Sequence, residues 1–259
     1  MKVLIGDIGN TVTKISLIEI KKFKIIKTFY FDSFKILRKK FLEKLLKKNT
    51  FQQDINKHAL FSSVVPKYKI KIRNFLKKNC NIKLVEIKDK KIKKNIIINL
   101  KNKNQIGSDR IANAISVYNK YKNNCIVVDF GTATTFDVIT KKGVYNGGVI
   151  APGVNLSIKN LAYSADQIPF FKLKVKKNVI GKNTLEALRA GFYWGYSGLI
   201  KNIIEKIEHE TKRKYKIIFT GGYANMLKSS ITKSVIIDKN ITINGLIEIF
   251  KQNKKYLIK

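Results

Sequence analysis

The sequence Cys125-Ile-Val-Val-Asp-Phe-Gly-Thr-Ala-Thr-Thr-Phe-Asp-Val-Ile139 is the best guide to the architecture of this chain. An apolar run ends at Asp129, a turn with Gly131 and three threonines follows, and a second run rich in β-branched residues closes the stretch. This order predicts a β-hairpin with a polar tip. Such a tip can offer backbone N–H groups and threonine hydroxyls to a phosphate, and its carboxylate can hold a cation.

The N-terminal residues 1–17 repeat this pattern, again as an apolar run, an Asp-x-Gly turn and a second run. The two stretches match position by position: Asp7 corresponds to Asp129, Gly9 to Gly131, Asn10 to Thr132 and Thr11 to Ala133. Two such hairpins more than a hundred residues apart predict two related half-folds that face one nucleotide. We therefore expect an N-terminal half at residues 1–120 and a C-terminal half at residues 121–259.

Length and composition indicate an ordinary folded protein. The chain has 259 residues, of which 44% are hydrophobic, so a normal core is available. No apolar run reaches the roughly 20 residues that span a bilayer, and Asp7 interrupts the apolar start, which argues against a signal peptide. Two cysteines are too few for a disulfide framework. We expect a cytoplasmic protein without a membrane partner.

The formal net charge of +36 raises the possibility of a nucleic-acid partner. However, the basic residues are nearly all lysines, spread over the whole length together with many isoleucines and asparagines. An AT-rich genome overproduces these three amino acids, which explains the charge without a partner. We expect salt-sensitive, nonspecific adhesion to polyanions but no specific nucleic-acid partner.

Hydrophobic periodicity predicts alternating strands and helices. Strands are expected at residues 3–8, 12–20, 23–31, 57–65, 82–87, 215–219 and 234–238, besides the two runs of the central hairpin. Helices are expected at 33–48, 67–79, 154–164, 185–207 and 242–253, and after Gly107. Ser33 is a candidate N-cap of the first helix and Thr184 of the long one. The Lys- and Asn-rich residues 88–105 predict a mobile loop.

Three features allow two interpretations each. Lys14, just beyond the first hairpin tip, is either one more surface lysine or a phosphate contact. Asp109, in the first turn of a helix, either stabilises the helix dipole or belongs to a site. The Thr220-Gly-Gly222 segment between a strand and a helix is either a plain turn or a support for a nucleoside.

Six motifs in one order resemble those of the actin-like ATPase superfamily, which includes sugar kinases, Hsp70 and actin, and within it those of type III pantothenate kinase. The motifs are Asp7-Ile-Gly-Asn-Thr11, Gly107-Ser-Asp-Arg110, Asp129-Phe-Gly-Thr-Ala-Thr-Thr135, Gly147-Gly-Val-Ile-Ala-Pro-Gly153, Asn183-Thr184 and Thr220-Gly-Gly222. The resemblance implies an α/β fold of two ribonuclease-H-like halves. Each half would be a mixed sheet flanked by helices, with the active site in the cleft between them.

The resemblance also implies a reaction. ATP would phosphorylate pantothenate to 4′-phosphopantothenate, the first step of coenzyme A biosynthesis. ATP would act with Mg²⁺ or another divalent ion, a monovalent cation (K⁺ or NH₄⁺) would be required, and the enzyme would be a homodimer.

The resemblance further implies roles for individual residues. Asp109 corresponds to the general base, Asp129 to the monovalent-cation ligand and Asp7 to a possible Mg²⁺ ligand. The implied ATP-binding residues are Asp7, Ile8, Gly9, Asn10, Thr11, Val12, Thr13, Lys14, Gly131 and Thr132. The implied substrate-binding residues are Leu100, Gly107, Ser108, Asp109, Arg110 and Thr184, with Arg110 suited to a carboxylate by its planar donor fork.

One position departs from the family pattern. The family usually carries a substrate-binding Tyr seven residues before the Gly of Gly-x-Asp-Arg, with a Pro three residues later. Here these positions are Leu100 and Lys103. Loss of one buried hydrogen bond costs about 0.5–1.5 kcal/mol, which would weaken substrate binding without abolishing it.

Two other functions remain open. The first is another small-molecule kinase of the same fold, which would share both hairpins but has no reason for Gly-Ser-Asp-Arg together with Thr184. The second is a non-catalytic regulatory or nucleic-acid-binding relative, which the net charge favours. The carboxylates Asp7, Asp109 and Asp129 argue against the second, because a pure binding module needs none of them.

Overall fold

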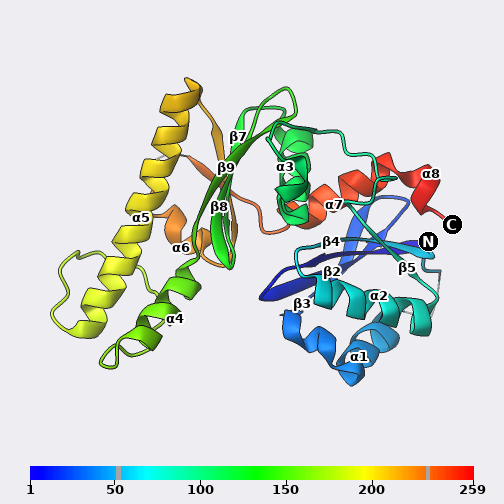
Figure 1. Cartoon of the computed structure of the whole chain (residues 1–259), viewed down its shortest axis with the longest axis horizontal. Helices are drawn as coiled ribbons and strands as arrows, with labels where there is room; N and C mark the ends of the chain where they lie inside the picture. The colour runs from blue at the N-terminus through cyan, green and yellow to red at the C-terminus, as the bar shows by residue number, and fades with distance from the viewer. Residues whose placement is uncertain (51–53, 232–233) are drawn as a thin grey trace. The chain divides into compact units, whose positions relative to one another are not determined.

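The computed structural model describes residues 1–50, 54–231 and 234–259 and divides the chain into two compact units (Figure 1). Unit 1 consists of Met1–Ile97, Lys101–Lys120 and Asn240–Lys259, and unit 2 of Ile98–Leu100 and Tyr121–Lys239. The chain thus passes from unit 1 to unit 2 at residues 120 and 121. The C-terminal residues, by contrast, return to unit 1.

Unit 1 contains a five-stranded mixed sheet in the order β3-β2-β1-β4-β5. Its strands are β1 (Lys2–Ile8), β2 (Val12–Glu19), β3 (Lys24–Asp32), β4 (His58–Ser63) and β5 (Lys83–Glu86). β1, β2 and β3 are antiparallel neighbours, whereas β4 runs parallel to β1 and β5 parallel to β4. The carboxyl ends of β1, β4 and β5 therefore meet at one edge of the sheet.

Helices cover both faces of this sheet (Figure 1). The helices of unit 1 are α1 (Lys39–Thr50), α2 (Pro66–Cys80), α3 (Ser108–Tyr121), α7 (Ile241–Gln252) and α8 (Lys254–Leu257), with short 3₁₀ turns η1 (Ser33–Leu37) and η2 (Lys103–Gln105). α1 and α2 share a hydrophobic core with β1, β2 and β4, and α7 contacts β1 and β4. Pro66 starts α2 because its fixed φ suits the first helical position.

The predicted helix at residues 33–48 is interrupted. η1 precedes α1, and the N-cap of η1 is Asp32. The prediction that Ser33 caps a helix was wrong. Ser33 is buried, and its hydroxyl donates a 2.7 Å hydrogen bond to the carbonyl of Gly9. The same hydroxyl lies 2.8 Å from Oγ1 of the buried Thr13. Ser33 supports the first hairpin instead.

Unit 2 contains a six-stranded sheet in the order β11-β10-β7-β8-β9-β6. Its strands are β6 (Ile97–Ile98), β7 (Cys125–Phe130), β8 (Ala133–Ile139), β9 (Val144–Pro152), β10 (Lys216–Gly221) and β11 (Val235–Ile237). β7, β8 and β9 are antiparallel neighbours, and β10 and β11 continue parallel to β7. Apart from β6, this is the strand order and sense of unit 1.

The duplicated strand pattern confirms the prediction of two related half-folds from the paired hairpins. Three helices complete unit 2: α4 (Val154–Ser164), α5 (Thr184–Thr211) and α6 (Ala224–Lys228). Alternate apolar residues of β7 and β8 form one core with these helices, because successive side chains of a strand point to opposite faces. Among the described residues, no helix is both long enough and apolar enough to cross a membrane.

Candidate active site

The first predicted phosphate-binding turn joins β1 to β2 in unit 1. Gly9 N–H donates 3.1 Å to the carbonyl of Val12, and a Cβ on Gly9 would lie only 2.8 Å from that oxygen. The turn therefore requires glycine at this position. Asn10, Thr11 and Val12 are exposed at the tip, while Ile8 and Thr13 are buried beneath it.

Asp7 and Lys14 pair across this hairpin. The Asp7 carboxylate accepts a hydrogen bond from the Ser62 hydroxyl at the end of β4. The Lys14 ammonium group lies 5.9 Å from the ring centroid of Tyr30. Both side chains are partly exposed, so both are accessible from the tip.

Two consecutive serines join the first tip to the start of α3. The Ser63 backbone N–H donates 2.8 Å to Oγ of Ser108, the first residue of α3. Ser62 holds Asp7 at the same point of β4. The sheet edge of unit 1 therefore brings the Asp7 tip and the Gly-Ser-Asp-Arg motif to neighbouring positions, although about a hundred residues separate them in sequence.

Asp109 lies in the first turn of α3 and is partly exposed as a whole residue. Its Oδ1 accepts a 2.8 Å hydrogen bond from the Arg110 backbone N–H. Burial raises the pKa of the Asp109 carboxyl, while the backbone N–H and guanidinium of Arg110 and the ammonium group of Lys88 act to lower this pKa. A carboxyl with a raised pKa that remains accessible is suited to proton transfer.

The neighbours of Asp109 in the motif have distinct structural roles. A Cβ on Gly107 would collide with the Asp109 carboxylate, so glycine leaves the room that this carboxylate occupies. Ser108 is buried and fastens α3 to β4. Of the implied substrate-binding residues in this motif, Asp109 and Arg110 carry the side chains that remain partly exposed.

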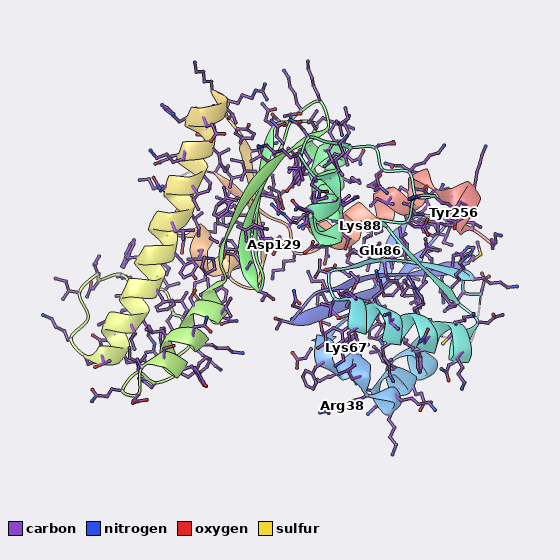
Figure 2. The ribbon with its side chains drawn as sticks, in the orientation of Figure 1. Arg38, Lys67, Glu86, Lys88, Asp129 and Tyr256 are labelled. Carbon is purple, nitrogen blue, oxygen red and sulfur yellow. The ribbon has the colours of Figure 1, made fainter. Side chains whose placement is uncertain are left out.

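The second predicted phosphate-binding turn joins β7 to β8 in unit 2. Gly131 N–H donates 3.1 Å to the carbonyl of Ala133, and Gly131 and Thr132 are exposed at the tip. Asp129 is the penultimate residue of β7, next to the tip, and is partly exposed (Figure 2). This arrangement matches that of Asp7 in unit 1.

Two glycine-containing turns close against this second tip. A Cβ on Gly153, at the start of α4, would collide with the Thr132 carbonyl. Gly221 has a φ of +87°, and a Cβ there would lie 2.5 Å from the Phe130 carbonyl. Gly222 N–H donates 3.1 Å to that same carbonyl. The backbones of these three segments thus lie close together in unit 2.

Thr184 is the first residue of α5, and the prediction that it caps this helix was wrong. The N-cap is Asn183, whose side-chain oxygen accepts 2.9 Å from the backbone N–H of Glu186. An Asn satisfies this N–H as well as a Thr does. The exposed Thr184 hydroxyl is consequently not committed to capping.

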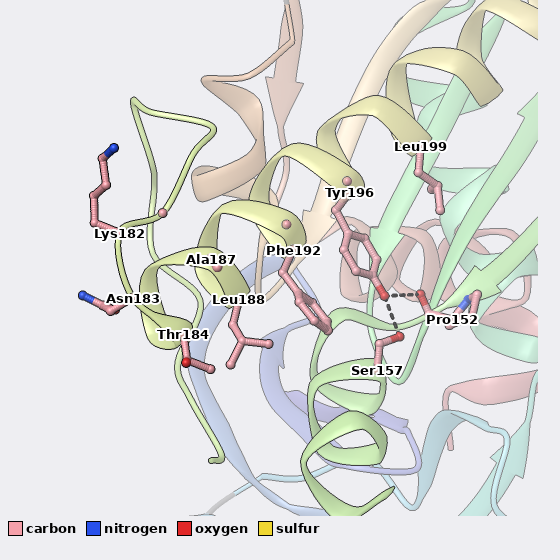
Figure 3. A pocket seen from close by; sticks show the side chains of 13 residues that line it. Pro152, Ser157, Lys182, Asn183, Thr184, Ala187, Leu188, Phe192, Tyr196 and Leu199 are labelled. Carbon is pink, nitrogen blue, oxygen red and sulfur yellow. Dashed lines mark hydrogen bonds between the residues drawn. The ribbon is translucent and has the colours of Figure 1, made fainter. Parts of the chain in front are cut away.

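Thr184 lines a groove of about 930 Å³ along α5. The groove is formed by Pro152, Ser157, residues 181–184 and the face of α5 that runs from Ala187 to Leu199. Two hydrogen-bond partners fix the phenolic oxygen of Tyr196 in this groove (Figure 3). It lies 2.7 Å from the Ser157 hydroxyl and donates a 3.2 Å hydrogen bond to the Pro152 carbonyl. The lining is mainly apolar, with Leu188 and Phe192 as its largest side chains in the middle of this face.

Leu100 belongs to unit 2. Its Cδ2 lies 3.5 Å from the position that a Cβ atom would occupy if Gly147 carried one. Leu100 therefore lies beside Gly147 of β9, whereas Gly107 to Arg110 belong to unit 1. The sequence interpretation missed Ser62 and Ser63 as members of the site. Two serines directly after a buried strand were the available signal, because parallel strands end at a common edge.

The comparisons with known proteins agree with these features. The profile of the family described as Type III pantothenate kinase matches residues 3–206. The chain belongs to this family. A type III pantothenate kinase from Pelagibacter ubique is 50% identical over 246 residues, which cover 95% of this chain and 97% of the relative. Another, from Sulfurihydrogenibium sp., is 36% identical over 250 residues, covering 94% and 97%.

Solved structures show the same fold at lower identity. A Baf family protein from Campylobacter jejuni has a TM-score of 0.64 at 23% identity, covering 98% of this chain and all of that protein. An inorganic polyphosphate/ATP-glucomannokinase from Arthrobacter sp. has a TM-score of 0.50 at 13% identity, covering 97% and 99%. These likenesses confirm the actin-like α/β fold that the family resemblance implies.

Proposed function

We propose that this chain transfers the terminal phosphoryl group of ATP to pantothenate, giving 4′-phosphopantothenate in the first step of coenzyme A biosynthesis, with Asp109 as the general base. Family membership supports the reaction. One observation carries the assignment of Asp109 as the base. The start of α3, where Asp109 lies, is fastened through Ser108 and Ser63 to the sheet edge that also bears Asp7.

The proton of the pantothenate alcohol passes to the Asp109 carboxylate as the alcohol oxygen forms its bond to the γ-phosphorus. The bond from that phosphorus to the bridging oxygen breaks, and ADP leaves. Little covalent chemistry is asked of the protein, so positioning dominates. The Arg110 guanidinium binds the pantothenate carboxylate, because its planar donors fit two oxygens at once.

Each hairpin tip offers phosphate oxygens its backbone N–H groups, together with the Asn10 and Thr11 side chains in unit 1 and the Thr132 side chain in unit 2. Mg²⁺ is usually held by one or two carboxylates and the substrate phosphates, so a single accessible Asp7 fits such an ion. Asp129 fits K⁺ or NH₄⁺ at the second tip. These ions supply positive charge to the phosphates when bound.

The enzyme acts as a homodimer in the cytoplasm, without a nucleic-acid or membrane partner. The groove along α5 supports self-association, because Gly191 and Gly195 line it and no atom lies within 4 Å of a Cβ on either. A second copy would cover this apolar face. The Thr184 hydroxyl at its edge then bonds the pantothenate amide.

A coupled assay of ADP release tests the proposal, with pantothenate as the sole phosphoryl acceptor and with or without K⁺. We expect release that needs pantothenate and rises with K⁺ or NH₄⁺, and a loss of at least about 100-fold for Asp109→Asn. Asp89→Asn, an exposed acid of the same unit, serves as the matched control. An Asp109→Asn rate within about threefold of wild type would reject the base.

A panel of other acceptors separates the alternatives. A sugar or another acid that is phosphorylated faster than pantothenate would favour a different kinase of the same fold. Sequence-selective DNA binding at physiological salt, without kinase activity, would favour the regulatory alternative.

A further inference from the structure

Lys88 follows β5 at the same sheet edge that carries the proposed base. β5 runs parallel to β4 with Glu86 opposite Phe61, and the Ile87 N–H donates 3.0 Å to the Phe61 carbonyl. Two residues further along each chain lie Lys88 and Ser63, and Ser63 is the residue that binds the start of α3. Lys88 therefore lies at the sheet edge to which Ser63 fastens the start of α3, next to Asp109 in sequence.

Two hydrogen bonds fix this lysine in unit 1. Its ammonium group donates 3.0 Å to the carbonyl of Asn104 in η2. Its backbone N–H donates 3.0 Å to Oε2 of the buried Glu86 (Figure 2). The first bond ties β5 to the segment that enters Gly107, and the second fixes the backbone from which the lysine extends.

The Lys88 ammonium group also acts on the Asp109 carboxyl. The guanidinium of Arg110 and the ammonium of Lys88 both lower the pKa that burial raises. Once Arg110 binds the carboxylate of pantothenate, much of its charge is neutralised by the substrate. Lys88 is then the cation that still favours an ionised Asp109.

We propose that Lys88 is a positioning residue for phosphoryl transfer, which fastens η2 beside Gly107 and keeps the Asp109 carboxylate ionised while substrate occupies Arg110. This inference rests on Asp109 being the base. It assigns the reaction a residue from the Lys- and Asn-rich segment 88–105, where the sequence indicated a mobile loop. Lys88 need not touch substrate to act in this way.

The first test compares the pH dependence of kcat at saturating pantothenate, which reports ionisation in the substrate complex, for the wild type, Lys88→Met, Lys88→Arg and Lys90→Met. Lys88→Met removes the charge but keeps most of the stem, so the pKa of Asp109 rises and the acid limb moves to higher pH. We expect about a threefold or greater loss on the acid limb and recovery towards wild type as the pH rises above it. Lys88→Arg retains the charge and should keep the wild-type limb.

Lys90→Met is the matched control, because Lys90 is an exposed lysine of the same turn. An acid limb that stays at its wild-type position in Lys88→Met, or that moves equally in Lys90→Met, would overturn the proposal. A uniform loss at all pH values would do the same, because it would indicate only a structural role. Thermal unfolding of each variant checks that the fold is retained.

The second test needs no turnover. Carbon-13 NMR of the aspartate carboxyl groups, assigned with Asp109→Asn, follows the titration of Asp109 in the ligand-free protein. Lys88→Met should raise its midpoint, and an unchanged midpoint would overturn the inference. If the midpoint rises but the rate profile does not move, Asp109 is not the base, and Lys88 loses its role in the reaction together with it.

Discussion

At the scale of single residues, Asp109 combines two opposed requirements. As the proposed base, Asp109 must be buried enough to hold the substrate in a defined place, and it must be ionised to accept a proton. Burial raises its pKa, while Arg110 and Lys88 lower it. This balance makes the carboxylate costly to the folded state and useful to the reaction.

The first prediction concerns stability. A folded-state pKa above the unfolded value means that the folded state binds the proton more tightly, so stability falls as pH rises through the raised pKa. Asp109→Asn removes this penalty and should raise the free energy of unfolding by roughly 0.5–2 kcal/mol at neutral pH. Chemical denaturation at neutral and acid pH measures the difference, which should vanish under acid conditions. A destabilised variant at neutral pH would contradict it.

The second prediction concerns Gly107. Gly107→Ala introduces a Cβ where the Asp109 carboxylate lies, so the carboxylate must move. A displacement of about 1 Å can cost on the order of 100-fold in rate. We expect kcat to fall by at least about tenfold, with ATP binding retained. Ala at Gly198, where no atom lies within 4 Å of the added carbon, is the control and should leave kcat unchanged.

At the scale of elements, helix ends decide which side chains stay available. Asn183 caps α5 through Glu186, so the neighbouring Thr184 is exposed and lines the groove. At the start of α3, the Ser108 hydroxyl binds Ser63 and so fastens α3 to β4, while Asp109 beside it stays partly exposed. In both helices, one residue anchors the terminus and the next faces outward.

The third prediction separates these two roles in α5. Asn183→Ala should lower the free energy of unfolding by about 1 kcal/mol, and Asn183→Asp should retain it. Thr184→Ala should change stability by less than about 0.5 kcal/mol but raise the KM for pantothenate about 2- to 13-fold, as expected for one lost hydrogen bond. Denaturant titrations and steady-state kinetics measure these effects. A larger loss in the free energy of unfolding for Thr184→Ala than for Asn183→Ala would refute this account.

At the scale of the whole molecule, the chain contains one strand pattern twice. The order β3-β2-β1-β4-β5 in unit 1 and the order β9-β8-β7-β10-β11 in unit 2 have the same sequence of antiparallel and parallel neighbours. Each copy places an Asp-x-Gly turn at the end of its first strand. The duplication explains why two Asp-x-Gly hairpin tips occur in a single chain.

The fourth prediction concerns self-association. Gly195→Glu would place a charge on the apolar groove of α5, and burying it in an interface would be unfavourable. We expect sedimentation velocity to show a dimer of the 29.7 kDa chain for the wild type and a shift towards monomer for the variant. Asn202→Glu, exposed on the same helix outside the groove, should remain dimeric. A monomeric wild type at micromolar concentration would reject the proposed dimer.

The sequence by itself determined the strand and helix order, the two hairpin tips and the related halves. These depend on local chemistry: apolar periodicity, and glycine where Gly9 and Gly131 make tight turns. The short motif Gly107-Ser-Asp-Arg110 also made Asp109 a candidate, because its residues are adjacent. The family motifs added the reaction, because six of them occur in one order along the chain.

Only the tertiary structure decided that Ser62 binds Asp7, 55 residues away, and that Ser63 binds Ser108, 45 residues away. It also decided that α7 packs with unit 1 and that Lys88 reaches the edge near Asp109. The physical reason is that parallel strand pairing joins distant segments through backbone hydrogen bonds, which every residue except proline can make in the same way. No local pattern of side chains records that choice of neighbours.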